Sequence, residues 1–187
     1  MVDVAVATDG RRLRGDASRR ALLAAASQVI VDDGVDALTH RAVAEAAGVP
    51  LARVSYHYPK IEDLMFAAAT EYLEGFDERL RALAEGAVVA QRSMVDACTD
   101  FLIELVTVRA AEFLAMVEVR LALHRRGRSV DDLGAVEIIR SFGADTRRAQ
   151  SIVAAMFGFA VLAATAPKPA TRPQVRTYVR SILGGLT

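Results

Sequence analysis

Tryptophan is absent from the 187-residue chain, and cysteine and proline are scarce. The single cysteine, Cys98, excludes a disulfide bond within the chain and is consistent with a reducing cytoplasm. The five prolines are Pro50, Pro59, Pro167, Pro169 and Pro173. Long intervals therefore contain no helix breaker, and alanine, the strongest helix former, is abundant. These features predict an all-α protein.

Neither sign of charge dominates, because 23 Lys and Arg residues balance 23 Asp and Glu residues. A nucleic-acid-binding protein without net charge needs a local basic patch, and residues 11–60 hold a modest excess of basic residues. Lys60 and Lys168 are the only lysines, so arginine would make most phosphate contacts. No segment is apolar enough to span a membrane, and the N-terminus lacks the basic region and apolar run of a signal peptide. We expect a cytoplasmic protein with no membrane partner.

Residues that would support enzyme chemistry are also few. The three histidines, His40, His57 and His124, lack a second histidine or a carboxylate at metal-binding spacing. Cys98 has no evident catalytic partner, and neither a GxGxxG nor a P-loop sequence occurs. The sequence therefore predicts no catalytic residue, no metal site and no cofactor. An all-helical enzyme is the least favoured interpretation.

Two short helices joined by a tight turn are predicted within residues 38–64. Thr39 is a good N-cap for the first helix, because its hydroxyl can accept a hydrogen bond from a first-turn backbone N–H. Gly48 can take the left-handed conformation that ends this helix, and Pro50 suits the start of the next. The second helix ends before Pro59. Helix, glycine turn and helix are typical of a helix-turn-helix motif, whose second helix enters the DNA major groove.

The second of these helices, from about Leu51 to His57, has few apolar residues to bury. Val54 and Tyr58 are four residues apart and are predicted to face the core. The other residues stay on the surface: Leu51, Ala52, Arg53, Ser55, Tyr56 and His57. Taken alone, this is the pattern of an ordinary solvated helix, so the residues on either side decide the interpretation.

Residues 19–64 contain a set of arginine, glycine, aromatic and apolar residues at characteristic spacings. They are Arg19, Leu22, Leu23, Ala25, Ala26, Val29, Ile30, Gly34, Thr39, Val43, Ala44, Ala47, Gly48, Val49, Tyr56, His57, Tyr58 and Leu64. In this pattern the first third of the chain resembles the N-terminal domain of TetR-family transcriptional regulators. The chain departs from the family at Ser55, where a tyrosine is usual, and at Pro50, which replaces a serine cap. The usual lysine after the recognition helix falls at Ile61, and Lys60 stands one residue early.

Base contacts are expected from the second helix. Arg53 is the best candidate for reading a base, because arginine forms two hydrogen bonds with guanine in the major groove. Leu51 and Ala52 can pack on thymine methyl groups. Tyr56 can touch either a base or a phosphate. These residue types in this order predict a sequence-specific DNA contact.

Phosphate contacts are expected from six residues around the motif. They are Thr39, His40, Arg41, Ser55, His57 and Lys60. His40 and Arg41 lie in the first turn of their helix, where backbone N–H groups and positive charge favour a phosphate. The resemblance implies the other four positions, with Lys60 in place of the displaced lysine.

Three regions are predicted along the chain. Residues 1–15 form a disordered tail, either a solvated terminus or a basic arm that reaches a minor groove. Residues 16–60 form the DNA-binding domain, with Asp16 or Ser18 capping its first helix and the helix-turn-helix at about 39–58. Residues 61–187 form a helical regulatory and dimerisation domain.

Helical spacing divides this last domain into further helices. The predicted helices cover about 61–86, 91–108, 110–126, 129–142, 145–166 and 173 onward. The basic stretch 125–128 is interpreted as a solvated connection, because positive charge suits a helix C-terminus. The resemblance implies that the last two helices pair with those of a second copy to form a homodimer, whereas a monomer would bury the same apolar residues as core.

An effector cavity is a further implication of the resemblance. Its predicted lining residues are Phe101, Leu105, Phe113, Met116, Val117 and Met156, although such a stripe could equally be plain core. Glu118 and Arg120 interrupt the apolar run of their helix, so Glu118 is either a polar anchor in the cavity or part of an ion pair. The composition favours a hydrophobic effector of unknown identity.

Taken together, these features predict a homodimeric, ligand-responsive transcriptional regulator. Its partners would be a palindromic double-stranded operator and a small-molecule effector, and it would act as a repressor that the effector releases from DNA. The alternative is a helical interaction or ligand-binding module that has lost specific DNA binding.

Overall fold

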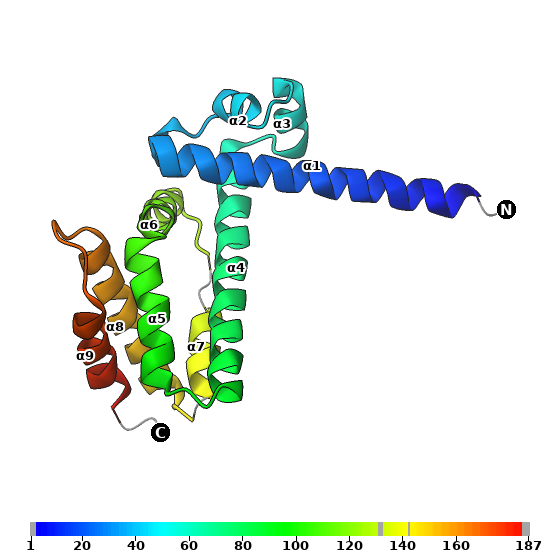
Figure 1. Ribbon diagram of the computed structural model, residues 1–187. Coiled ribbons are helices and arrows are strands. Elements are labelled where there is room, and N and C mark those ends of the chain that lie inside the picture. The colour runs from blue at the N-terminus through cyan, green and yellow to red at the C-terminus, as the bar shows by residue number, and fades with distance from the viewer. Residues whose placement is uncertain (1–2, 131–132, 142, 185–187) are drawn as a thin grey trace. The chain divides into compact units, whose positions relative to one another are not determined.

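The computed structural model describes residues 3–130, 133–141 and 143–184, and within these ranges the chain is all-α (Figure 1). The helices are α1 (Asp3–Asp33), α2 (His40–Ala46), α3 (Leu51–His57), α4 (Ile61–Val89), α5 (Met94–Thr107), α6 (Ala110–Arg125), α7 (Leu133–Ser141), α8 (Thr146–Ala164) and α9 (Arg172–Leu183), with a short 3₁₀ helix at Val35–Ala37. The predicted fold class is therefore confirmed. No helix of the described chain is long and apolar enough to cross a membrane.

Helix α1 differs from the prediction at its start. It begins at Asp3, so residues 3–15, expected to be a disordered tail, are helical, and Asp16 and Ser18 lie inside the helix. Residues 1 and 2 of that expected tail lie outside the described ranges. The segment contains no proline, and its Ala, Leu and Arg residues favour a helix. Each of its two glycines lowers helix stability by only about 1 kcal/mol relative to alanine.

Helices α2 and α3 form the predicted helix-turn-helix beside α1 (Figure 1). Thr39 caps α2, and its hydroxyl accepts a hydrogen bond from the Ala42 N–H at 3.1 Å. Gly48 ends the turn with φ of 63°, a conformation that glycine takes at little cost. Pro50 is the N-cap residue of α3. Its carbonyl oxygen accepts the first hydrogen bond of the helix, from the Arg53 N–H. The motif thus forms where local chemistry predicts it.

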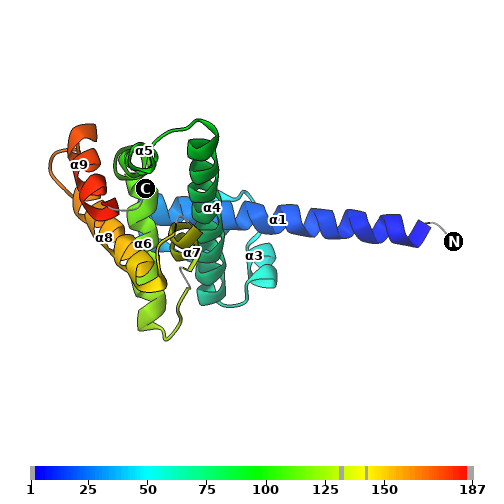
Figure 2. The ribbon, with the colours of Figure 1, turned by 90° about the horizontal axis from the view of Figure 1, so that it is seen from below.

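Two units can be distinguished in the described chain. The first unit comprises the chain up to Glu71 together with Val117–Val130, and the second comprises the remainder. Helices α4 and α6 each contribute residues to both units. Within the second unit, α5 packs against α8 and α9, and α7 packs against α8, as the two views of the ribbon show (Figures 1 and 2).

Ion pairs join α5 to α9 in the second unit. Arg176 Nε lies 2.8 Å from Asp96, and Arg172 Nη2 lies 2.7 Å from Asp100. Hydrogen bonds from Ser93 and Arg176 lower the pKa of Asp96. Hydrogen bonds from Arg92 and Arg172 lower the pKa of Asp100. These hydrogen bonds favour the charged form of both aspartates.

The ends of the later helices follow recognisable caps. Asp145 caps α8 by accepting a hydrogen bond from the Arg148 N–H at 2.9 Å, as predicted. Gln174 accepts from the Thr171 N–H at 3.0 Å at the start of α9. The helix predicted over residues 129–142 appears as α7 and begins only at Leu133, whereas its predicted end at Phe142 lies outside the described residues.

Candidate DNA-binding surface and effector cavity

The recognition helix α3 has the two faces that its sequence predicts. Val54 is fully buried and Tyr58, directly after the helix, is 3% exposed. Leu51 is 51% exposed and Tyr56 is 82% exposed. Ala52, Arg53 and Ser55 are also exposed. One buried side chain and one buried aromatic therefore fix the helix, and the opposite face is free to contact a ligand.

Tyr58 connects three elements of the first unit. Its hydroxyl accepts a hydrogen bond from Arg19 Nε at 3.0 Å, and the guanidinium carbon of Arg19 lies 5.6 Å from the ring centre. This hydrogen bond raises the pKa of Arg19 further above its usual value. The carbonyl oxygen of Tyr58 lies 2.7 Å from Nε2 of His40, which must donate the proton. Helices α1 and α2 thereby hold the end of α3 in place.

The residues with predicted phosphate contacts differ in exposure and in the hydrogen bonds that they already make. Arg41, Ser55 and Lys60 are exposed. Thr39 is exposed, and its hydroxyl can still donate a hydrogen bond while it accepts from the helix. His57 is half-buried, with its ring 5.4 Å from that of Tyr56. The His40 ring, in contrast, is engaged with backbone, which favours a supporting role for this residue.

Sequence reasoning missed a set of ion pairs at the start of α4. Arg128 Nη1 lies 2.8 Å from Asp63, and its guanidinium carbon lies 4.4 Å from the centre of the Phe66 ring. Arg126 Nε lies 4.0 Å from Glu62. The stretch 125–128, interpreted as a solvated connection, therefore contacts the first turn of α4. The sequence does contain a signal for these ion pairs. Glu62 and Asp63 are adjacent acidic residues, and Arg128 in the basic stretch follows Asp63 by 65 residues.

An apolar cavity of about 70 Å³ lies within the second unit. Its lining comes from α4 to α8 and comprises Phe76, Leu80, Cys98, Phe101, Leu102, Leu105, Phe113, Ala135, Ile139, Val153, Met156, Phe157 and Ala160. Four of these residues were expected from the sequence: Phe101, Leu105, Phe113 and Met156. The rings of Phe113 and Phe157 meet edge to face, 5.6 Å apart.

The other four predicted effector residues do not line this cavity. Met116 is buried in the core, and Val117 is half-buried. Glu118 is exposed, because it shares one face of α6 with the exposed Leu121 and Arg125. Arg120 is also absent from the lining. Of the two alternatives for Glu118, this position agrees with the surface one, because the helical repeat turns the residue away from the buried side of α6.

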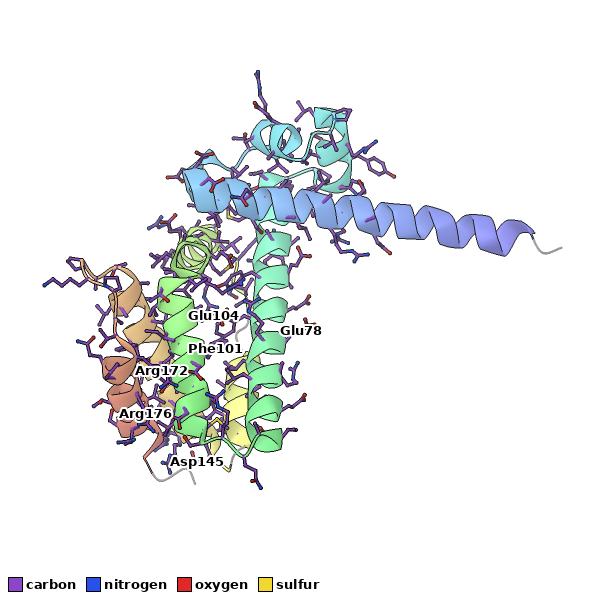
Figure 3. All side chains as sticks on the ribbon, viewed as in Figure 1. Glu78, Phe101, Glu104, Asp145, Arg172 and Arg176 are labelled. Carbon is purple, nitrogen blue, oxygen red and sulfur yellow. The ribbon has the colours of Figure 1, made fainter. Side chains whose placement is uncertain are left out.

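A second, more polar pocket of about 230 Å³ adjoins the cavity. It is lined by Phe76, Arg79, Ala82, Leu83, Phe101, Glu104, Leu105 and Arg109, so it shares three residues with the apolar cavity. The Phe76 and Phe101 rings meet edge to face at 5.2 Å and form part of both walls. Figure 3 shows Phe101 and Glu104 along α5, with Glu78 on α4. The two pockets thus differ in polarity but have a common aromatic boundary.

Helix α8 exposes an apolar stripe. Phe157 is 38% exposed and Leu162 is 73% exposed, and Ala154 and Gly158 lie on the same exposed face. Beside this stripe, Tyr178 of α9 stacks on Phe159 at 4.2 Å and donates a hydrogen bond to the Ala155 carbonyl at 2.8 Å. Helix α9 therefore covers the flank of α8 next to the stripe, and Leu162 stays exposed.

An anchored helix-turn-helix with an exposed recognition face is the arrangement of helix-turn-helix DNA-binding proteins. Residues 22–68 match the family described as bacterial regulatory proteins, tetR family. This match identifies the N-terminal region, from α1 to the start of α4, as a TetR-family DNA-binding domain, and the rest of the chain lies outside it. Among the described residues, no group of three His, Cys, Asp or Glu side chains is arranged to hold a metal ion.

Solved structures agree with this assignment. The multidrug binding protein EbrR complexed with ethidium is similar over 88% of this chain and 98% of its own, with 25% identity and a TM-score of 0.75. A TetR-family member from Streptomyces coelicolor A3 covers 88% of this chain and 97% of its own, with 24% identity and a TM-score of 0.71. EbrR also matches in complexes with proflavin and with malachite green. No curated protein matches the chain in sequence.

Proposed function

We propose that this chain is a homodimeric, cytoplasmic repressor that binds a palindromic operator through α3 and is released by a small molecule. The observation that carries the DNA-binding part is the exposed face of α3, held by the buried Val54 and Tyr58. The DNA-binding domain would end near Lys60, and the rest of the chain would bind the effector and form the dimer.

Ten residues would contact the operator in this proposal. They are Thr39, His40, Arg41, Leu51, Ala52, Arg53, Ser55, Tyr56, His57 and Lys60. Arg53 reads guanine, and Leu51 with Ala52 meets thymine methyl groups. Tyr56 is 82% exposed, so it can touch a base or a phosphate. His40 acts mainly by holding the end of α3.

Selection from a random duplex DNA pool at near-physiological salt tests this function. We expect a palindromic site, bound by two subunits, whose affinity falls about tenfold to a hundredfold in Arg53→Ala. Arg81→Ala, an exposed arginine of α4 outside the DNA-binding domain, is the matched control and should leave affinity unchanged. No enrichment, with only weak salt-sensitive binding, would instead support an interaction module that has lost specific DNA binding.

The exposed stripe of α8 supports a dimer interface. Phe157 and Leu162 are large apolar residues exposed beside the small residues Ala154 and Gly158, which allow close helix approach. The exposed residues of α9, including Arg172 and Arg180, are mostly polar and suit the rim of an interface. A second copy of the chain, packed with its last two helices against these, would cover the stripe.

Sedimentation equilibrium of a charged variant tests the dimer. Leu162→Arg should convert the protein to a monomer, because an unpaired charge would be buried in the interface. Val108→Arg replaces an equally apolar, 82% exposed residue outside α8 and should leave the dimer intact. Dimers that persist in the Leu162 variant would place the interface elsewhere.

The apolar cavity supports an effector site. At about 70 Å³ it is smaller than the roughly 150 Å³ cavity known to hold benzene, so an aromatic effector must displace part of its lining. The similarity to EbrR, which was solved with ethidium, makes ethidium a suitable first probe. Such displacement within the second unit is a means of shifting the population away from the DNA-binding conformation.

Cys98 provides a direct report on the cavity. It lines the cavity, and burial raises its pKa to about 11, so little thiolate exists at neutral pH. Maleimide should therefore label it slowly, and a bound effector should slow labelling further. Ligand that lowers operator affinity without changing the labelling rate would indicate a different effector site.

Helices α4 and α6 are the proposed route between effector and operator. Each contributes residues to both units, and Arg128 and Arg126 join the end of α6 to the first turn of α4. Asp63→Asn would remove the closest of these ion pairs. We expect this variant to bind the operator but to need a different effector concentration for release, measured by anisotropy titration.

A further inference from the structure

Three buried side-chain polar atoms in the described chain have no hydrogen-bond partner: Tyr72 Oη, Arg79 Nη2 and Arg109 Nε. All three can donate a hydrogen bond, and the two guanidinium nitrogens can do nothing else. Buried donors without an acceptor are unfavourable by about 1–3 kcal/mol each, so three together are unusual. An acceptor that fills this place would relieve all of them.

The three groups belong to one cluster in the second unit. Arg79 and Arg109 line the polar pocket of about 230 Å³. Tyr72 is close enough to both guanidinium groups for each to act electrostatically on its hydroxyl. Burial nevertheless raises the pKa of Tyr72 to about 12, so the hydroxyl keeps its proton at neutral pH. Two guanidinium groups thus line the pocket, and the Tyr72 hydroxyl, which does not line it, lies within their electrostatic reach.

Carboxylates of the protein satisfy only part of this cluster. Glu112 forms an ion pair with Nη2 of Arg109. Nε of the same side chain stays buried without a hydrogen-bond partner. Glu104 also lines the pocket, but its side chain is exposed to solvent. An incoming anion would therefore meet Arg79 and, at Arg109, a guanidinium that Glu112 already pairs on one side.

The polar pocket borders the apolar cavity. Phe76, Phe101 and Leu105 line both this pocket and the 70 Å³ cavity. A ligand with its charged end at the arginines would have its apolar part directed past the Phe76–Phe101 ring pair. The cavity beyond this pair is lined almost wholly by carbon and would exclude a charged group.

We propose that the effector is an anionic amphiphile, whose carboxylate binds Tyr72, Arg79 and Arg109 while its apolar body fills the cavity behind Phe76 and Phe101. This inference rests on the proposed function, because it assigns a ligand class to the same effector site. It differs from the ligands of the similar EbrR structures, since ethidium and proflavin are aromatic cations.

Isothermal titration with three ten-carbon probes tests the ligand class. Decanoate, decanol and decyltrimethylammonium carry the same chain with an anionic, a neutral and a cationic head. We expect decanoate to bind at least tenfold more tightly than decanol, because charge-assisted hydrogen bonds replace three unsatisfied donors. Equal or tighter binding of decanol, or preference for the cation or for ethidium, would overturn the proposal.

Two variants locate the carboxylate. Arg79→Gln should weaken decanoate by about tenfold to a hundredfold, and Tyr72→Phe by up to about tenfold, with decanol affinity unchanged in both. Arg81→Gln, an exposed arginine two residues further along α4, should affect neither probe. Equal losses for decanoate and decanol would show that Arg79 shapes the cavity without binding a charge, and would contradict the proposal.

An operator titration in the presence of decanoate separates this inference from the regulatory function. Decanoate that binds with the expected variant pattern but leaves operator affinity unchanged would support the ligand class and contradict effector-driven release. Failure of all three probes to bind, with specific operator binding intact, would overturn the anionic site and leave the DNA-binding proposal standing.

Discussion

Helix α3 buries only Val54 along its length, whereas α5 buries six of its 14 residues, including Cys98, Leu102 and Leu105. The first helix needs to be held at one point and can offer the rest of its surface to DNA. The second is part of a core, so the residues that line its cavity also determine stability. Substitutions on α3 can therefore change recognition with little effect on folding, while substitutions on α5 affect both.

The largest expected effect comes from Val54, the only side chain that α3 buries along its length. Val54→Asp would place an isolated carboxylate at a fully buried position and should destabilise the first unit by about 4 kcal/mol or more. Urea unfolding followed by circular dichroism, together with operator titration, measures this change. Ser55→Asp, at the exposed neighbouring position, should leave stability within about 0.5 kcal/mol. A Val54 variant as stable as the parent protein would contradict this role of Val54.

A smaller loss of stability is expected from a substitution in the cavity wall. Leu105→Ala removes a buried side chain that lines the cavity and should lower stability by about 2–3 kcal/mol, near the low end for such changes, because the space is already incompletely filled. The enlarged cavity should also bind ethidium or another bulky probe more tightly. Val108→Ala, exposed at the end of the same helix, is the control. Loss of stability in both variants alike would mean that Leu105 does not contribute as core.

The two regions also differ in how well their sequence predicts them. The helix-turn-helix depends on local features: Thr39 caps, Gly48 turns, and Val54 and Tyr58 face inward, all within one short segment. Each feature acts through neighbours in the chain, so the pattern determines the structure. The exposed face of α3 then follows by elimination, and the structure agrees with it.

The cavity depends on how five helices are rotated against each other. A stripe such as Phe101 and Leu105 indicates a buried face but not the helix that covers it, so only half of the predicted residues reach the cavity. Val117 and Glu118 follow Phe113 closely in sequence, yet the turn of α6 and its passage into the first unit take them elsewhere. The donors at Arg79 and Arg109 were not predicted, because arginines 30 residues apart form no recognisable motif.

Helix caps give a matched test in each region. Thr39→Ala and Asp145→Ala each remove a side chain that accepts a hydrogen bond from a first-turn N–H, and each should lower stability by about 1 kcal/mol. Only Thr39→Ala should also weaken operator binding, because its hydroxyl is a proposed phosphate contact. Urea titration and anisotropy on the same preparations distinguish the two effects. An equal loss of operator affinity in the Asp145 variant would indicate that the regions are coupled through stability alone.

The smallest loss of stability is expected when the pH is lowered. Hydrogen bonds from Ser93 and Arg176 lower the pKa of Asp96, and those from Arg92 and Arg172 lower that of Asp100. A carboxylate with a lowered pKa in the folded state stabilises the protein above its unfolded pKa, and this contribution is lost as pH falls through the folded value. The Asp96 and Asp100 side chains are 28% and 36% exposed, and the solvent that reaches them screens these ion pairs. The stability of the α5–α9 contact should therefore decline only slightly, beginning below about pH 4. Thermal unfolding from pH 7 to pH 3 measures this decline. The double variant Asp96→Asn with Asp100→Asn should be less stable at pH 7 and show a flatter pH dependence, whereas an unchanged slope would place the acid-sensitive groups outside the second unit's α5–α9 contact.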